Sequence, residues 1–169
     1  MTKTLYMLIG PKGSGKTYIG TLVDRHTDIR FIRVEPIWLS LPPGADGWKT
    51  VESVIDQTFQ THDHVMIESL GAGEGFRGFY ASLSQKYPIQ MIRVFADLET
   101  CLTRVQTRAN TDHIPVSDDK VMEYNQIAAQ VTYPWALEID NNGPAPAETI
   151  LTAIQSLLNV RPTPPDPSP

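Results

Sequence analysis

The feature that most constrains this chain is the stretch from Gly10 to Thr17. It matches the pattern G-x-x-x-x-G-K-[ST] without a departure. An apolar run at residues 4–9 precedes it, and a plausible helix follows it. A glycine-rich turn between a strand and a helix directs backbone N–H groups, and the positive end of the helix dipole, at a bound anion. The sequence therefore predicts a phosphate-binding loop that joins a first strand to a first helix.

The residue types of this loop also predict what it binds. Its glycines allow the backbone to curl around phosphate oxygens. Lys16 is expected to place its charge on the β- and γ-phosphates, and the Thr17 hydroxyl is expected to ligate Mg²⁺. The N-K-x-D motif that selects guanine does not occur, so we expect ATP with Mg²⁺ as the ligand. The expected nucleotide-binding residues are Gly10, Pro11, Lys12, Gly13, Ser14, Gly15, Lys16 and Thr17.

Short apolar runs alternate with helical spacing along the rest of the chain. The runs that predict strands span residues 4–9, 30–34, 65–68, 89–95 and 136–140. Apolar side chains recur at i, i+3 and i+4 between and after these runs, which predicts helices. This alternation indicates a three-layer α/β/α sandwich, with a parallel sheet of about five strands between two layers of helices. Ligands of such sheets bind beyond the carboxyl ends of the strands, where the phosphate loop is also expected.

Composition limits the number of domains and the kinds of partner. A chain of 169 residues is long enough for one domain, which we place at residues 1–160. Residues 161–169 hold five of the fourteen prolines, so a disordered Pro-rich tail is expected there. A net charge of −5 does not attract nucleic acid, and a single cysteine, Cys101, excludes an internal disulfide or a cysteine-based zinc site. Because no apolar run is long enough for a bilayer span or a secretory signal, we expect no membrane partner and a cytoplasmic location.

Two glutamates are expected at strand ends on the same edge as the loop. Glu68 ends the predicted third strand, where it can hold Mg²⁺ or orient a nucleophile; the alternative is a carboxylate that caps the glycine loop after it. Glu35 ends the predicted second strand and is expected to orient a phosphoryl acceptor and take its proton. The alternative for Glu35 is a surface glutamate before a proline turn. Which of the two carboxylates is the base stays open.

The stretch 95–108 reads Phe-Ala-Asp-Leu-Glu-Thr-Cys-Leu-Thr-Arg-Val-Gln-Thr-Arg. With the phosphate loop, it resembles the small P-loop kinases, the group of shikimate, gluconate and adenylate kinases in the AAA-type P-loop NTPase superfamily. The resemblance covers residues 4 to about 158. In this group a strand ending in Ala-Asp precedes a helix whose R-x-x-x-R arginines close over the nucleotide and stabilise the transferred phosphoryl group. The resemblance implies these roles for Arg104 and Arg108, which their spacing also places on one helix face; the alternative is a solvated basic face.

The resemblance further implies where the acceptor and a lid lie. In this group the region after the third strand binds the acceptor, which implies substrate-binding roles for Gly71, Gly73 and Arg77, with Arg77 gripping an anionic group. Residues 109–117 correspond to a lid that closes over the nucleotide, and His113 within it is either a substrate contact or a solvated loop histidine.

Two other segments complete the expected site. The insertion from Trp38 to Trp48 is expected to form the wall of the acceptor site opposite residues 71–77. Each indole is expected either to stack on substrate or to pack in the core. Residues 137–144 correspond to the loop that passes the adenine ring in the resembling kinases.

Together these observations predict an ATP-dependent phosphotransferase that moves the γ-phosphoryl group of Mg-ATP to a hydroxyl or phosphate of a small-molecule acceptor. One alternative is a nucleotide-dependent switch or slow ATPase without such an acceptor. Another is a nucleic-acid end kinase, which the acidic net charge disfavours. The second predicted strand lacks the D-x-D pattern of shikimate kinase, and the loop after the third lacks three successive glycines. The sequence therefore identifies no acceptor and no oligomeric state.

Overall fold

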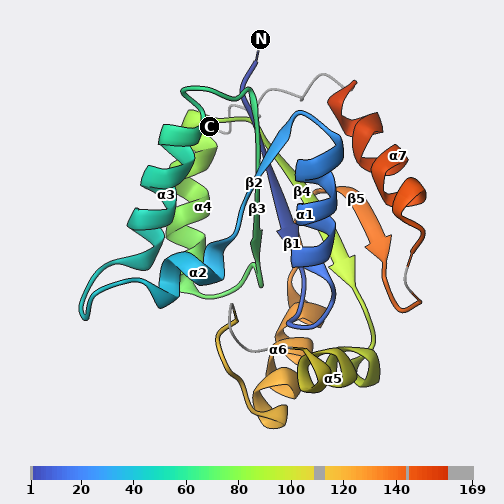
Figure 1. Ribbon diagram of the computed structural model, residues 1–169. Coiled ribbons are helices and arrows are strands. Elements are labelled where there is room, and N and C mark those ends of the chain that lie inside the picture. Colours follow the sequence, from blue (N-terminus) through green and yellow to red (C-terminus); the bar gives the residue numbers. More distant parts are fainter. Residues whose placement is uncertain (1, 109–112, 144, 160–169) are drawn as a thin grey trace.

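The fold is an open parallel β-sheet with helices on both faces (Figure 1). The computed structural model describes residues 2–108, 113–143 and 145–159. The strands are β1 (Thr4–Ile9), β2 (Ile29–Ile32), β3 (His64–Ser69), β4 (Ile89–Phe95) and β5 (Trp135–Asp140). They form one five-stranded sheet in the order β2-β3-β1-β4-β5, and each neighbouring pair is parallel. The predicted three-layer α/β/α sandwich is therefore confirmed.

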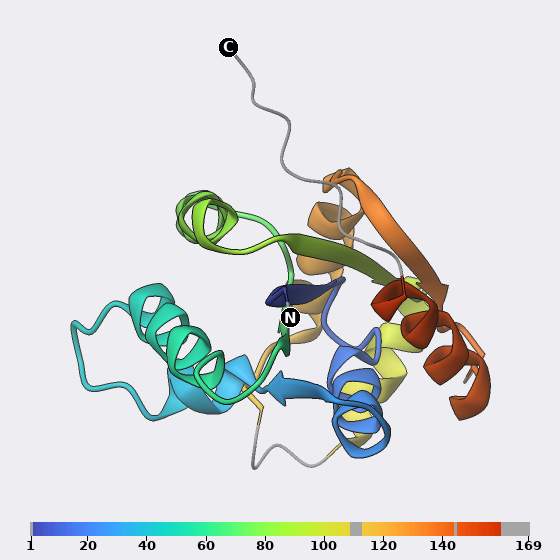
Figure 2. The ribbon, with the colours of Figure 1, turned by 90° about the horizontal axis from the view of Figure 1, so that it is seen from above.

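Helices form the two outer layers and a cap at one edge. They are α1 (Lys16–His26), α2 (Val34–Leu39), α3 (Gly47–Thr58), α4 (Glu74–Lys86), α5 (Leu98–Thr107), α6 (Asp118–Gln130) and α7 (Ala147–Leu158). Two perpendicular views show α3 and α4 on one face of the sheet and α1 and α7 on the other, with α5 and α6 beyond the carboxyl ends of the strands (Figures 1 and 2). Among the described residues, no helix combines the length and apolarity needed to cross a membrane. The predicted tail and residues 109–112 of the predicted lid lie outside the described residues.

The central strand β1 is buried on both faces. Leu5, Met7 and Ile9 pack in the cluster beneath α3 and α4, while Tyr6 and Leu8 pack in the cluster beneath α1 and α7. Each of these side chains is at most 2% exposed. Successive side chains of a strand point to opposite faces, so a strand covered on both sides must be apolar throughout. The end of β1, and with it the start of the phosphate loop, is therefore held firmly between the two layers.

Helix α6 has no counterpart among the predicted elements. It packs on α5 through a small third cluster that includes Cys101, Val105 and Val121. The Ser117 side chain accepts a hydrogen bond from the Lys120 amide at its start, and two aspartates occupy its first turn. Serine caps and acidic first turns are recognisable signals of a helix start, so this helix could have been predicted from the sequence.

The structure corrects the prediction for the end of the second strand. Strand β2 ends at Ile32, and the chain enters helix α2 at Val34, so Glu35 lies in the first turn of a helix and not at the end of a strand. The helix forms because Val34, Ile37 and Trp38 recur at i, i+3 and i+4 and pack against the core. A proline is tolerated in the first turn, where its missing N–H has no helical partner to lose.

Two helix glycines test how tightly the helices pack on the sheet, because one lies against a ring of β2 and the other faces open space. A Cβ atom at Gly20 in α1 would lie 2.4 Å from a ring carbon of Phe31, whereas at Gly78 in α4 it would meet nothing within 4 Å. Gly78→Ala is therefore expected to raise the free energy of unfolding by about 0.5–1 kcal/mol. Gly20→Ala is expected to lower it by about 1–3 kcal/mol, because the ring must move within a packed core. Urea denaturation measures both; stabilisation by both would contradict the contact between α1 and β2.

Candidate functional site

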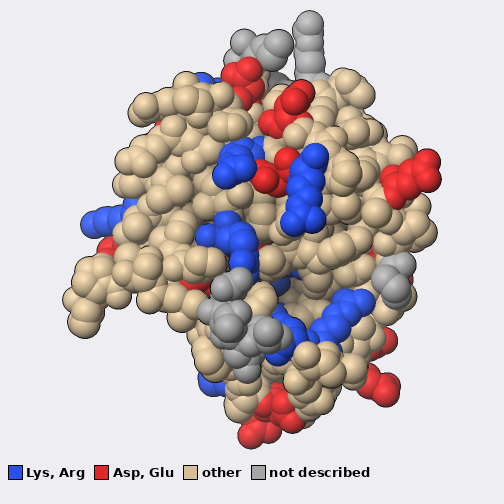
Figure 3. Space-filling model, viewed as in Figure 1, with Lys and Arg blue, Asp and Glu red and all other residues tan. Residues whose placement is uncertain are grey.

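A cavity of about 600 Å³ opens at the carboxyl edge of the sheet. It lies between the phosphate loop, α2 and the α5–α6 pair, and Figure 3 shows basic side chains at the border of the hollow in this region. The residues predicted from the sequence that line it are Gly10, Lys12, Gly13, Gly15, Lys16, Thr17, Glu35, Glu68, Arg104 and Arg108. The remaining predicted loop residues, Pro11 and Ser14, are buried. The fold thus brings together residues that are nearly a hundred positions apart in the sequence.

The phosphate loop has the conformation that its glycines were expected to allow. Gly13 and Gly15 have φ angles of +84° and +99°, in the region where L side chains are strained. A Cβ atom at Gly13 would also lie 2.5 Å from the backbone oxygen of Cys101. Helix α1 begins at Lys16, directly after the loop. Its unpaired N-terminal amides and its dipole therefore face the bend of the loop, which suits a phosphate group.

Arg104 braces the loop from the α5 side. Its Nη1 donates to the carbonyl oxygens of Gly13 and Ser14 at 3.3 Å each, and its Nη2 donates to the carbonyl oxygen of Asn141 at 2.6 Å. The Asn141 side-chain amide, which is buried, donates to the Ser14 carbonyl oxygen at 2.8 Å. Arg104 therefore ties together the loop, α5 and the segment after β5. Asn141 lies in the segment 137–144 that was expected to pass the adenine ring, but no sequence signal indicated its contacts with Arg104 and the phosphate loop.

Arg108 lines the cavity, but not from the helix face that its spacing predicted. Helix α5 ends at Thr107, and the Arg108 backbone is extended, so the two arginines do not share a helix face. Arg108 nevertheless lines the cavity, and its buried Nε has no hydrogen-bond partner among the described residues. Burial lowers the pKa of its guanidinium, while the charges of Glu35 and Glu68 favour the protonated form. This arginine is available to an anion.

The Lys16 side chain folds back onto its own loop. Its Nζ donates to the carbonyl oxygens of Gly10 at 2.8 Å and of Pro11 at 2.9 Å. Loss of hydration lowers the pKa of this ammonium to about 8, although the charges of Glu68 and Glu35 favour its protonated form. A phosphate oxygen offers a stronger partner than a carbonyl oxygen, so the ammonium is positioned to exchange one for the other.

Thr17 and Glu68 form a hydrogen-bonded pair beside the loop. The Thr17 hydroxyl donates to Glu68 Oε2 at 2.7 Å. Glu68 is 5% exposed, and its Oε1 is buried without a hydrogen-bond partner among the described residues. A buried carboxylate oxygen without a hydrogen-bond partner is unfavourable. A hydroxyl and a carboxylate are the oxygen ligands that Mg²⁺ prefers, so this donor set fits the predicted metal.

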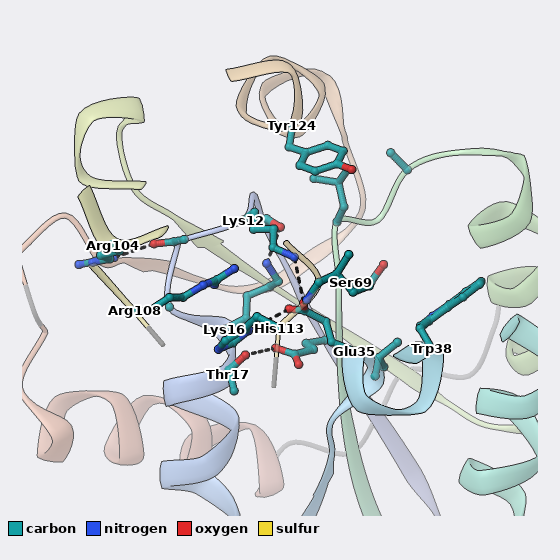
Figure 4. A pocket seen from close by; sticks show the side chains of 18 of the residues that line it. Lys12, Lys16, Thr17, Glu35, Trp38, Ser69, Arg104, Arg108, His113 and Tyr124 are labelled. Atoms are coloured by element: carbon teal, nitrogen blue, oxygen red, sulfur yellow. Dashed lines mark hydrogen bonds and ion pairs between the residues drawn. The ribbon is translucent and has the colours of Figure 1, made fainter. Parts of the chain in front are cut away.

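Glu35 is the centre of a cluster that joins the phosphate loop to the segment after α5 (Figure 4). Its Oε2 accepts from Lys12 Nζ at 2.9 Å and from the Ile114 amide at 2.7 Å, and its Oε1 lies 3.3 Å from His113 Nδ1. Burial by itself raises the pKa of the Glu35 carboxyl, but the hydrogen bonds from Lys12 and Ile114 and the Lys12 charge lower it to about 2. Glu35 is therefore ionised, and His113 faces it instead of bulk solvent.

Of the four residues expected to bind the acceptor, Glu35 lines the cavity and the other three do not. Gly71, Gly73 and Arg77 are not among the residues that line the cavity; Gly71 is buried, its carbonyl oxygen accepts from the Tyr133 hydroxyl at 2.7 Å, and Arg77 is exposed on α4. Other side chains, most of them apolar or aromatic, also line the cavity. They are Val34, Trp38, Trp48, Ser69, Leu70, Ala72, Ile114 and Tyr124.

The sequence indicated only some of these residues as part of the site. Ser69 ends β3 and Leu70 follows it, at the edge where ligands were expected. For Trp38 and Trp48 the sequence left open a place at the acceptor or packing in the core; both side chains line the cavity and also pack against the core. Tyr124 lies on α6, whose position follows from its packing on α5, so no local pattern indicated it.

Comparison with solved structures shows that this is the fold of the small P-loop kinases. Shikimate kinase from Acinetobacter baumannii, solved with shikimate, matches 94% of this chain and 94% of its own, with a TM-score of 0.59 and 19% identity. Deoxyadenosine kinase from M. mycoides, solved with dATP, matches 92% of this chain and 100% of its own, with a TM-score of 0.57 and 13% identity. A chain of the Pnkp1/Rnl/Hen1 RNA repair complex has a TM-score of 0.65 at 14% identity; the match covers 76% of this chain but only 45% of that one. No family model matches the sequence, and no curated protein does.

The lowered pKa of Lys16 makes stability depend on pH in a defined direction. Unfolding returns the ammonium to water and raises its pKa from about 8 to about 10.4. The unfolded chain then binds more protons between these values, so the contribution of this group to stability rises with pH across that window. Relative to a Lys16→Met variant, the wild-type protein is expected to gain about 3 kcal/mol of unfolding free energy between pH 7 and pH 10.5. Urea denaturation of both proteins measures this; a constant difference would contradict the desolvated position of Lys16.

Proposed function

We propose that this chain transfers the γ-phosphoryl group of Mg-ATP to a hydroxyl or phosphate of a small molecule. The observation that carries the proposal is that the phosphate loop, the Thr17–Glu68 pair and a separate aromatic wall share one cavity. Such a cavity has room for a nucleotide on one side and an acceptor on the other. The matched structures include shikimate and deoxyadenosine kinases, which supports the same class of reaction.

The proposed reaction breaks the bond between the γ-phosphorus and its bridging oxygen and forms a bond from that phosphorus to the acceptor oxygen. ADP and the phosphorylated acceptor leave, and an acceptor hydroxyl loses its proton to solvent. Lys16 neutralises charge on the phosphates, and Arg108 supplies a second positive charge close by. Arg104 acts indirectly, because it holds the loop in shape. Thr17 and Glu68 would hold Mg²⁺, which when bound neutralises charge on the phosphate oxygens.

Glu35 is better suited to orienting groups than to removing a proton. A general base is most effective when its pKa is near the working pH, whereas the pKa of Glu35 is lowered to about 2. Phosphoryl transfer has a loose transition state and needs positioning more than proton removal. We therefore infer that Glu35 holds Lys12 and residues 113–114 in place beside the phosphate loop, and that a strong base is not required.

One observation favours a second candidate function. The contact of Glu35 with Lys12 and with the Ile114 amide links the phosphate loop to the segment after α5. A ligand that draws Lys12 away from Glu35 would loosen that link, which is the behaviour of a nucleotide-dependent switch or slow ATPase. The two functions differ in one product: only a phosphotransferase yields a phosphorylated acceptor.

Replacing Lys16 tests the nucleotide site. Lys16→Ala is expected to lower ATP turnover at least about a hundredfold, because the loop loses the charge that meets the phosphates. The measurement is ADP release with Mg²⁺ across a panel of nucleosides, nucleoside monophosphates, sugar acids, shikimate and amino alcohols. Lys49→Ala, which removes an exposed lysine of α3, is the matched control and should behave as the wild type. Wild-type turnover by Lys16→Ala would exclude the phosphate loop as the site.

Replacing Glu35 separates positioning from nucleotide binding. Glu35→Gln keeps the shape of the side chain but removes the charge that holds Lys12, so transfer is expected to fall about tenfold to a hundredfold. Nucleotide affinity, measured by calorimetry with a non-hydrolysable ATP analogue, should change much less. Glu148→Gln, at an exposed position of α7, is the control. Equal loss of affinity and of transfer would show that Glu35 only supports the loop.

A further inference from the structure

The cavity has two chemically different sides. Its polar side is the phosphate loop with the arginines from the α5 region. The side formed by α2, the start of α3 and the residues after β3 is aromatic and apolar except for the Glu35 carboxylate of α2. That apolar wall consists of Val34, Trp38, Trp48 and Leu70, and Ile114 and Tyr124 also border the cavity. In Figure 4, Trp38 lies across the site from Arg104 and Arg108, with Glu35 and Ser69 between them. The phosphates and the acceptor body therefore meet surfaces of opposite character.

The Trp38 indole is held in place by the protein itself. A Cβ atom at Gly47 would lie 2.3 Å from a carbon of the Trp38 ring, so the indole rests directly on this glycine. Trp48 meets Trp38 edge to face, with ring centroids 5.5 Å apart and planes at 85°. Trp48 is in turn packed on Phe79, with centroids 4.6 Å apart. The indole is thus ordered before a ligand arrives, and stacking on it requires little loss of side-chain entropy.

The positively charged side chains that line the cavity interact with other groups and not with this apolar wall. Lys12 and His113 face Glu35, and Lys16 is bonded to its own loop. Arg104 donates to backbone carbonyl oxygens, and Arg108 lies on the phosphate-loop side, where it experiences the charges of Glu35 and Glu68. Among the described residues that line the cavity, none offers a cation to the apolar wall. An acceptor with a carboxylate would have to bury that charge there without a partner.

We propose that the acceptor is an uncharged hydroxyl compound with a flat aromatic ring, the chemistry of a nucleoside, and that Trp38 determines this specificity by stacking on the ring. Flat aromatic rings stack well on indole, whereas a sugar acid has no flat face and carries a charge. The inference rests on the proposed function, since the step is the same transfer: the ring compound's hydroxyl oxygen bonds to the γ-phosphorus, the bond to ADP breaks, and the hydroxyl proton leaves to solvent.

The first test measures binding without chemistry. Equilibrium dialysis of labelled adenosine, guanosine, cytidine and thymidine is carried out with Mg²⁺ and a saturating non-hydrolysable ATP analogue, which blocks the nucleotide site. At least one nucleoside is expected to bind, and ribose, gluconate and shikimate are expected not to. Trp38→Leu should raise the dissociation constant of that nucleoside at least about tenfold, while Trp38→Phe, which keeps a flat ring, should change it about threefold or less. Trp135→Phe, outside this cavity, is the matched control.

A folding control and a second variant allow the test to be interpreted even if Trp38→Leu does not fold. Thermal unfolding by circular dichroism shows whether each variant folds. If Trp38→Leu does not, Gly47→Ala replaces it, because the added methyl displaces the indole without removing it and is also expected to weaken nucleoside binding. The comparison of nucleosides with ribose and sugar acids needs no variant at all.

The second test measures turnover with the same compounds. Faster ADP release and a phosphorylated nucleoside, with KM raised by Trp38→Leu more than kcat is lowered, would support the inference. Transfer to gluconate or shikimate but to no nucleoside would overturn it and leave the proposed function standing. Trp38-dependent nucleoside binding without any phosphorylated product would overturn the proposed function and leave the ring-binding site standing. Absence of nucleoside binding, or binding that Trp38→Leu leaves unchanged, would overturn the inference.

Discussion

The carbonyl groups of the phosphate loop are held by side chains from three separate parts of the chain, and the candidate site depends on this. Lys16 binds the carbonyls at the start of the loop, Arg104 binds those of Gly13 and Ser14, and Asn141 also binds Ser14. A buried carbonyl that is satisfied in this way keeps its orientation. In a glycine-rich turn, that orientation leaves the amide groups on the opposite side, where an anion can meet them. The loop is therefore shaped by contacts within the protein before any ligand is bound.

The charges around the cavity are balanced in pairs, with a few atoms left over. Glu35 satisfies Lys12, and Glu68 accepts from Thr17 through one of its two carboxylate oxygens. The other oxygen of Glu68 and the Nε of Arg108 are buried without partners among the described residues. Unsatisfied buried charges are unfavourable in the free protein and become favourable once a ligand of opposite charge arrives. A magnesium–phosphate group carries both charges, so these leftover atoms agree with the function proposed for the site.

The elements that the sequence predicted best were strands that appear as short apolar runs bounded by turns. Strands β1 and β4 were predicted to the residue, because a strand buried on both faces or nearly so is a short apolar run between turns. Helix α2 was missed because it is short and contains Pro36, although its apolar spacing was present. Helix α6 was missed although Ser117 and the aspartates after it form a helix start. In both cases the pattern existed: the proline was read as a turn in the first, and no element was assigned to residues 118–130 in the second.

The sequence by itself determined the phosphate loop, the alternation of strands and helices, and the edge of the sheet at which the cavity opens, because these depend on local spacing and on the general geometry of parallel sheets. Only the tertiary structure decided the partners of each side chain. It showed that Glu35 is held by Lys12, that Arg104 supports the loop, and that Trp38 lines the cavity whereas Arg77 does not. Such contacts join residues far apart in the sequence, and the physical reason they escape prediction is that each depends on how whole elements pack, which no local pattern records.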